Sequence, residues 1–286
     1  MAVAFKAPVK DIVFGYEVVE TYDIISKIPA FSDFNEDIVI PTMEECAKFA
    51  EEVLAPINAI GDQQGATIKD GKVTMPKEFV DAYKSFSEAG WASISLPSEI
   101  GGGGMPIALS GGTLEILSTA NLAFGLAPGL AAGAISAINF HGSEDQKAKF
   151  LPKLVSGEWT GTMNLSEPQS GSDLGTITTK AEPQEDGTYK ITGTKVWITF
   201  GEHDLTDNII HLVLAKIPGS PEGTKGISMF IVPKVMVNED GSLGEDNNVS
   251  CISIEEKLGI HASPTCVMEY DGSVGYLVGE ENRGLN

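Results

Sequence analysis

The stretch 163-MNLSEPQSGSDLG-175 contains the residues best suited to holding a polar or anionic ligand. Ser166, Gly171 and Ser172 offer hydroxyls and unobstructed backbone N–H groups on a tight turn between strand-like segments. Such a turn can form a nest of N–H groups that binds phosphate oxygens, even in an acidic protein. The alternative is a plain surface turn in which Ser172 or Asp173 hydrogen-bonds to the local backbone.

A second candidate lies in 193-GTKVWITFG-201. Strand alternation places Trp197 and Thr199 on the same face, so an aromatic wall would stand beside a hydroxyl. A planar cofactor edge could use that combination. The alternative is an ordinary cross-strand pair in a core.

Other motif searches give no site. The run 101-GGGG-104 is followed by Pro106 and Ile107, so it does not satisfy G-x-G-x-x-G, and no G-K-[ST] completes a P-loop. The four histidines are scattered, which predicts no metal site. The three cysteines show no C-x-x-C pairing, so neither a disulfide framework nor a zinc site is predicted.

The charge of the chain limits its partners. Among 286 residues, 40 are acidic and 19 are basic, which gives a formal net charge of -21. That balance argues against nucleic-acid binding and against docking on an anionic membrane. An anionic ligand must therefore be held by local donors.

The setting predicted for the chain is cytoplasmic and soluble. The N-terminal residues lack the hydrophobic region and cleavage site of a signal peptide. Residues 116–140 are uncharged over a length that could span a bilayer, but Pro128 interrupts them and no basic residues flank them. We expect two buried helices joined near residues 127–129.

The two halves of the chain follow different periodicities. Helical spacing predicts helices over 41–61, 76–91 and 143–158; capping-box patterns at Thr42/Glu45 and Ser143/Gln146 start two of them, and Pro152 should kink or divide the third. After about residue 158, the segments 188–199, 209–217 and 226–235 are short, β-branched and separated by turn residues. These patterns predict an α+β fold with an all-α N-terminal domain (1–158) and an antiparallel, barrel-like β domain (159–275). Residues 276–286 would begin a further domain.

In combination, the two candidate stretches resemble the flavin-binding middle domain of the acyl-CoA dehydrogenase family. The segments 95-SLPSEIGGGGMP-106 and 257-KLGIHASPTCVMEYDG-272 extend that resemblance over nearly the whole chain. The extension 6-KAPVKDIVFGYEVVETYD-23 and the stretch 201–219 are most similar to the branch that includes 3-(methylthio)propanoyl-CoA dehydrogenase.

The resemblance implies FAD as the cofactor and assigns its contacts to the two stretches. Met163, Leu165 and Ser166 would meet the flavin, and Gly171 and Ser172 would contact cofactor and acyl-CoA phosphates, with Ser172 also binding substrate. From the second stretch, Trp197, Ile198 and Thr199 would lie against the ring. Two departures stand out: Ser166 occupies a position where many relatives have threonine, and Phe200 one where asparagine is common.

The resemblance further implies α,β-dehydrogenation of an acyl-CoA thioester, with a carboxylate base and a hydride acceptor. The family's base lies in a C-terminal helical bundle, which we expect to be absent from this chain, so no catalytic residue is assigned and Glu167 is not offered as one. Electron-transfer flavoprotein would be the acceptor, and the complete enzyme a homodimer or homotetramer. The alternatives are a non-catalytic acyl-CoA-binding or partner-binding module, and a related flavin oxidase or monooxygenase.

Overall fold

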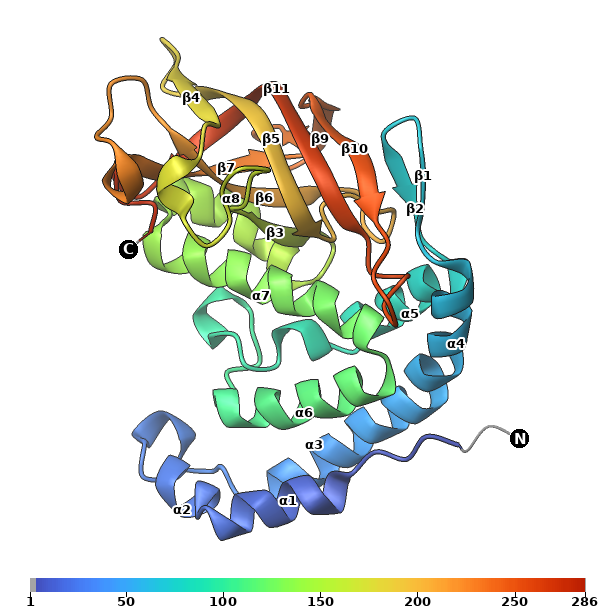
Figure 1. Ribbon diagram of the computed structural model, residues 1–286. Coiled ribbons are helices and arrows are strands. Elements are labelled where there is room, and N and C mark those ends of the chain that lie inside the picture. The colour runs from blue at the N-terminus through green and yellow to red at the C-terminus, as the bar shows by residue number, and fades with distance from the viewer. Residues whose placement is uncertain (1–3, 286) are drawn as a thin grey trace.

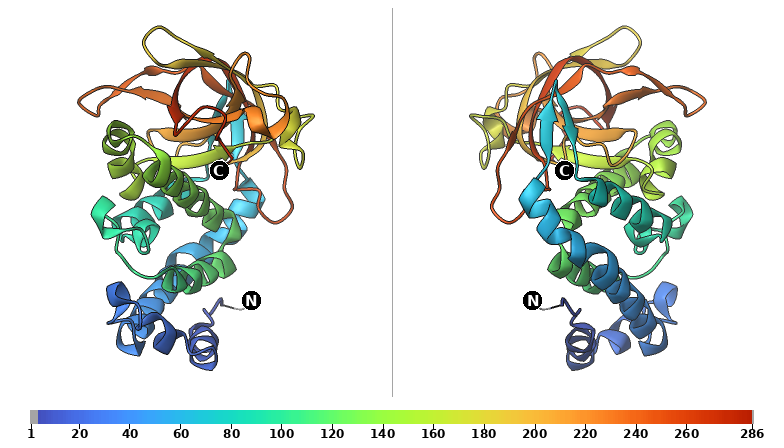
Figure 2. Two further views of the ribbon diagram at one scale, coloured as in Figure 1. Left: turned by 90° about the vertical axis from the view of Figure 1, so that its left-hand side faces the viewer. Right: turned by 90° about the vertical axis from the view of Figure 1, so that its right-hand side faces the viewer.

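The computed structural model describes residues 4–285 and has two layers, with helices below and a β barrel above (Figure 1). The side views in Figure 2 show the same separation, with α7 and α8 directly under the strands. Residues 1–3 and 286, which the predicted domain bounds include, lie outside the described residues. The division into domains itself stays a prediction.

The helical layer is formed mainly by segments of the first half of the chain. Its α-helices are α1 (Val9–Val18), α2 (Thr21–Ile25), α3 (Glu36–Phe49), α4 (Ala55–Gln64), α5 (Lys77–Glu88), α6 (Ile107–Ala120), α7 (Leu122–His141) and α8 (Glu144–Val155). The predicted capping box at the start of α8 is confirmed, because Ser143 and Gln146 exchange both hydrogen bonds. Pro152 does not divide α8.

The first predicted helix was wrong at its start. Asn35 caps α3 through a bond from Asp37 N to its side chain, and the helix continues through Pro41. Thr42 is therefore inside the helix, where its hydroxyl donates to the Ile38 carbonyl at 2.7 Å. A π-helical turn, Ala50–Leu54, joins α3 to α4, so one helical run covers what the spacing had predicted as a single shorter helix.

The predicted break near residues 127–129 was also wrong. The break falls at Asn121, whose side chain accepts from Phe124 N and thereby caps α7, while Pro128 lies inside that helix. Burial of residues such as Ala131, Ala134 and Ile135 offsets the hydrogen bond that proline removes. α7 is long and apolar enough to cross a membrane, but here it packs against β3, α6 and α8 as a core helix does.

The strands form one main sheet and two small separate two-stranded sheets. They are β1 (Thr67–Lys69), β2 (Lys72–Thr74), β3 (Thr160–Asn164), β4 (Lys180–Pro183), β5 (Tyr189–Thr199), β6 (Ile209–Lys216), β7 (Ile227–Pro233), β8 (Val235–Val237), β9 (Leu243–Asp246), β10 (Val249–Glu255) and β11 (Thr265–Val278). The sheet closes because β7 pairs with both β6 and β11, which gives the ring β11-β5-β4-β6-β7. The predicted boundary at residue 275 falls inside β11.

Two details of the fold class differ from expectation. The barrel is not purely antiparallel, since β3 and β4 each pair with β6 in parallel. The segment 165–179, which includes the 3₁₀ turn Leu174–Thr176, returns the chain so that β4 runs in the same direction as β3, and β6 regains that direction after the intervening antiparallel strand β5. The first half is not purely helical either, because the β1–β2 hairpin rises beside β10 (Figure 1).

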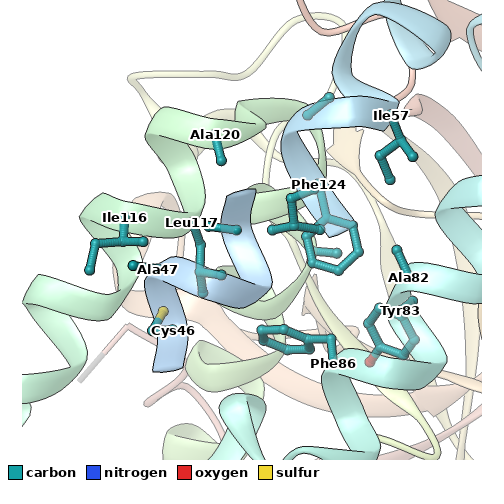
Figure 3. Packing of buried hydrophobic residues seen from close by; sticks show 14 of the residues in the cluster. Cys46, Ala47, Ile57, Ala82, Tyr83, Phe86, Ile116, Leu117, Ala120 and Phe124 are labelled. Carbon is teal, nitrogen blue, oxygen red and sulfur yellow. The ribbon is translucent and has the colours of Figure 1, made fainter. Parts of the chain in front are cut away.

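Aromatic side chains hold the helices together. Phe124 of α7 packs edge-to-face on Phe86 of α5, with ring centroids 5.5 Å apart, and Tyr83 lies next to both (Figure 3). Cys46 and Leu117 fill the neighbouring space between α3 and α6. Because α7 also packs on β3, the helical layer supports the strand from which the first candidate stretch leaves.

Candidate functional site

The structure brings the two candidate stretches together. The backbone N–H of Val196 in β5 donates to the Ser166 carbonyl at 3.0 Å, and Lys195 Nζ donates to the Leu165 carbonyl at 3.0 Å. The chain that leaves β3 is thus fixed along the edge of β5. Stretches about thirty positions apart in sequence therefore lie side by side.

A buried ion pair lies beneath this surface. Lys195 Nζ and Glu167 Oε1 are 2.9 Å apart, and the two side chains are 0% and 1% exposed. The Glu167 carboxylate also accepts from the backbone N–H and the hydroxyl of both Thr178 and Thr179, at 2.6 to 3.0 Å. Gln169 Nε2 donates to it as well, at 2.8 Å. The pair therefore ties β5, the 165–170 loop and the segment before β4 to one another.

These contacts decide the protonation of Glu167. Burial alone raises the pKa of the Glu167 carboxyl. The charge of Lys195 and the hydrogen bonds from Thr178 and Thr179 outweigh burial and lower the pKa to about 2. A carboxylate with so low a pKa and so many donors is a structural anchor and a poor base. Its environment supports leaving it out of the catalytic assignments.

Trp197 stands out from β5 because the strand bulges there. The ladder with β11 slips between Cys266 and Met268, and Trp197 takes a φ of +59°, which is uncommon for an aromatic residue. Its indole is 53% exposed, whereas Ile198 is 3% exposed. Trp197 and the half-buried Thr199 share the outer face, while the Ile198 side chain belongs to the barrel core. Only the backbone of Ile198 could therefore touch a ligand on that face.

Several polar groups on this surface form no hydrogen bond with other residues among 4–285. Within residues 4–285, the hydroxyls of Ser166, Ser172 and Thr199 make no hydrogen bond to another residue. The local backbone of the 170–175 turn is instead satisfied by Asp173, whose Oδ1 accepts from Gly175 N at 2.9 Å. A side chain at Gly171 would meet no atom within 4 Å, so the turn is open to approach.

Met163 and Leu165 of the predicted site lie on the side of the barrel that faces the helical layer. Met163, in β3, is half-buried, and its Cγ would be 3.9 Å from a Cβ placed on Gly133 of α7. Leu165 is half-buried beside it in the chain. Phe200, in contrast, is 2% exposed and packs with the helical core, so it presents no side chain to this surface.

Sequence reasoning missed Lys195 as the partner that positions the site. A signal was present, since Lys195 continues the inward alternation of Tyr189 and Ile191, and a lysine buried in a strand requires an acid nearby. The sequence interpretation concerns Glu167 only as a candidate base. Two further buried residues, His203 and His211, hydrogen-bond the hydroxyls of Thr160 and Thr162 at 2.9 and 2.7 Å. Burial lowers the pKa of each histidine to about 3.

Comparison with family models matches both halves of the chain. Residues 42–158 match the acyl-CoA dehydrogenase N-terminal domain, and residues 162–273 match the acyl-CoA dehydrogenase middle domain.

Curated relatives agree over nearly the full chain. It is 48% identical over 281 residues to 3-methylmercaptopropionyl-CoA dehydrogenase of Ruegeria pomeroyi, covering 98% of this chain and 48% of that protein. It is 40% identical over 263 residues to a butyryl-CoA dehydrogenase of Syntrophomonas wolfei, covering 90% of this chain and 41% of that protein. The chain thus spans about half the length of these relatives.

Solved structures of the family have the same fold as this chain. An acyl-CoA dehydrogenase complexed with FAD from Bacillus anthracis superposes with a TM-score of 0.70 at 28% identity, over 88% of this chain and 39% of that one. Butyryl-CoA dehydrogenase from Megasphaera elsdenii gives 0.70 at 26% identity, over 88% and 61%.

Proposed function

The chain belongs to the acyl-CoA dehydrogenase family, and from this premise we propose that it forms the flavin-binding part of an FAD-dependent enzyme that converts an acyl-CoA thioester to the 2-enoyl-CoA. The observation that carries the proposal is the surface formed by the two stretches. It combines an exposed indole, three hydroxyls without a hydrogen-bond partner among residues 4–285 and an open glycine turn, all carried by the closed barrel.

The residues present fit a flavin. The indole of Trp197 offers a flat apolar wall, and Thr199 places a hydroxyl on the same face. Ser166, Leu165 and Met163 would line the opposite edge of the cofactor, with the Ile198 backbone beside Trp197. Gly171 and Ser172 would meet phosphate oxygens of cofactor and substrate. FAD, when bound, supplies the hydride acceptor of the reaction.

The acyl group of the substrate is proposed from the relatives. The Ruegeria pomeroyi protein is named for 3-methylmercaptopropionyl-CoA, and the identity of 48% supports a similar short thioether acyl chain here. No base is assigned among residues 4–285, since the low pKa of Glu167 and its inward position disfavour it. Electron-transfer flavoprotein as acceptor and a homodimer or homotetramer complete the proposal.

A visible absorption spectrum of the 286-residue chain with added FAD tests the proposal. We expect the chain to retain flavin and Trp197→Ala to weaken that retention, because the variant removes the aromatic wall. Ile252→Ala is the matched control, since Ile252 in β10 is also 53% exposed but lies off the proposed surface. Equal flavin occupancy in all three proteins would refute the role of Trp197.

Two alternatives are separated by the same sample. A chain that binds acyl-CoA but never flavin would be the non-catalytic module. Rapid reaction of the reduced flavin with oxygen would favour an oxidase or monooxygenase.

A further inference from the structure

One ammonium group is completely buried, and it lies directly behind the candidate site. The Lys195 side chain is 0% exposed, whereas the other lysines that form ion pairs among residues 4–285 have side chains that are 21% to 81% exposed. Taking a charge out of water costs free energy that its contacts have to offset. The contacts of Lys195 therefore indicate what this charge does.

The Glu167 carboxylate does not depend on Lys195 for its hydrogen bonds. It accepts five others, from the N–H and hydroxyl groups of Thr178 and Thr179 and from Gln169 Nε2. Among residues 4–285, the contact that only Lys195 supplies is the one from its Nζ to the Leu165 carbonyl, at 3.0 Å. This second contact distinguishes a lysine at position 195 from any other group that could satisfy Glu167.

The contact with Leu165 decides which way the next N–H group points. The described chain has no cis peptide bond, so the Leu165 carbonyl and the Ser166 N–H lie on opposite sides of one planar peptide. Because the carbonyl points at the buried ammonium, the Ser166 N–H points away from it. Among residues 4–285 this N–H donates to no other group, and Ser166 is half-buried.

The Ser166 N–H also lies where the two candidate stretches meet. The Ser166 carbonyl accepts from Val196 N at 3.0 Å, and Val196 directly precedes the exposed Trp197. The loop that carries this N–H is therefore held beside the indole for which a flavin contact is proposed above.

A positive charge at the carbonyl end of a peptide makes the N–H at its other end a stronger donor. The ammonium draws electron density toward the Leu165 oxygen, and hydrogen bonds linked through one peptide strengthen each other, most of all where the dielectric constant is low. Burial lowers the pKa of Lys195, but Glu167 Oε1, at 2.9 Å, opposes this change and holds the ammonium in place. One peptide thus connects the buried charge to the surface.

We propose that Lys195 is a positioning residue that acts on the flavin through the Leu165–Ser166 peptide and favours the reduced cofactor. The inference rests on the proposed function, because it concerns the same surface. Reduction adds negative charge to a flavin ring, and a stronger N–H donor stabilises the charged form more than the neutral form. Lys195 is fully buried, so its effect reaches the cofactor through the Ser166 N–H and not by contact.

The reduction potential of FAD bound to the 286-residue chain tests the proposal. The double variant Glu167→Gln with Lys195→Met leaves neither charge unpaired, so it should fold and bind FAD. We expect its preference for reduced over oxidised FAD to fall about tenfold, which lowers the two-electron potential by about 30 mV. Glu202→Gln with Lys234→Met is the matched control, because this largely buried pair of the barrel forms no hydrogen bond with the described residues 163–175.

A measurement without flavin separates this proposal from the proposed function. In the ¹⁵N-labelled chain, the amide signal of Ser166 should move in the Lys195 double variant and keep its position in the control variant. The amide signal of Gly171 should keep its position in both, because Gly171 lies in the same stretch but shares no peptide with Leu165.

Equal potentials in the unaltered chain and the Lys195 double variant, or an equal fall in both double variants, would overturn the proposal. So would complete loss of FAD from the Lys195 double variant alone, because the lysine would then only hold the loop in shape. A Ser166 amide signal that does not move would also overturn it. An unaltered chain that binds no flavin would refute the proposed function, and the polarised peptide would then be supported or refuted by the Ser166 signal alone.

Discussion

Removing one partner of the buried pair Glu167–Lys195 should destabilise the protein strongly at neutral pH. The fall in the Glu167 pKa from 4.5 to about 2 corresponds to about 3 kcal/mol of folding free energy, and burial, which lowers the pKa of Lys195, offsets part of this gain. Lys195→Met would leave a carboxylate buried without its counter-ion, and Glu167→Gln would leave a buried ammonium. Each single change should therefore cost about 3 to 5 kcal/mol.

The double variant separates the pair from its surroundings. Because neither charge remains unpaired in Glu167→Gln with Lys195→Met, its loss should be clearly smaller than the sum of the two single losses. The assay is urea unfolding at pH 7. Lys147→Ala, which breaks the exposed pair with Glu144, should leave the unfolding midpoint unchanged. Additive single effects below about 1 kcal/mol would refute this account.

The same pair predicts an acid dependence. Glu167 binds its proton more weakly in the folded state than in the unfolded state, so its contribution is complete above pH 4.5 and disappears as the pH falls toward 2. Unfolding curves between pH 5 and pH 2 should show this slope in the unaltered chain. Glu167→Gln should remove it.

Three further predictions concern other parts of the chain. In the folded protein the pKa of His203 and of His211 is about 3, against 6.5 for an ordinary histidine, so the free energy of unfolding should fall by about 2 kcal/mol per histidine as the pH is lowered from 7 to 5. If urea unfolding showed no change over that range, the buried, neutral state of the two histidines would be contradicted. Ser143→Ala removes the capping bond to Gln146 N and should cost about 1 kcal/mol in the same assay, whereas Ser32→Ala, at an exposed position, serves as the comparison. Gly133→Ala should stabilise α7 by about 1 kcal/mol, because the added methyl meets only Met163 at 3.9 Å; lower stability would show that the space is not free.

Local signals in the sequence predict the elements that are determined by residues close to one another in the chain. The capping box at Ser143 and the alternation in β5 were read correctly because each depends on neighbouring residues. The starts of α3 and α7 differ from the prediction because Asn35 and Asn121 cap these helices, and Pro41 and Pro128 lie inside them. Packing of the flanking apolar residues keeps both helices continuous through these prolines, and packing is a tertiary property.

The candidate site also has features that the sequence predicts and features that it does not. The residue types of Ser166, Ser172 and Trp197 can be read in the sequence, and the resemblance placed them together. The bulge that turns Trp197 outward could not be predicted, because it depends on the register between β5 and β11.

Closure of the barrel by β11 has a consequence for how the protein is made. β11 pairs with β10, β5 and β7, and its last residues, Tyr276 to Val278, complete the ring through Ile231, Phe230 and Met229. During synthesis, β5 and β7 must therefore wait with unpaired edges until β11, residues 265–278, has left the ribosome. We expect a nascent chain halted before Tyr276 to need chaperone protection, and release of that segment to be the step that makes the barrel resistant to protease.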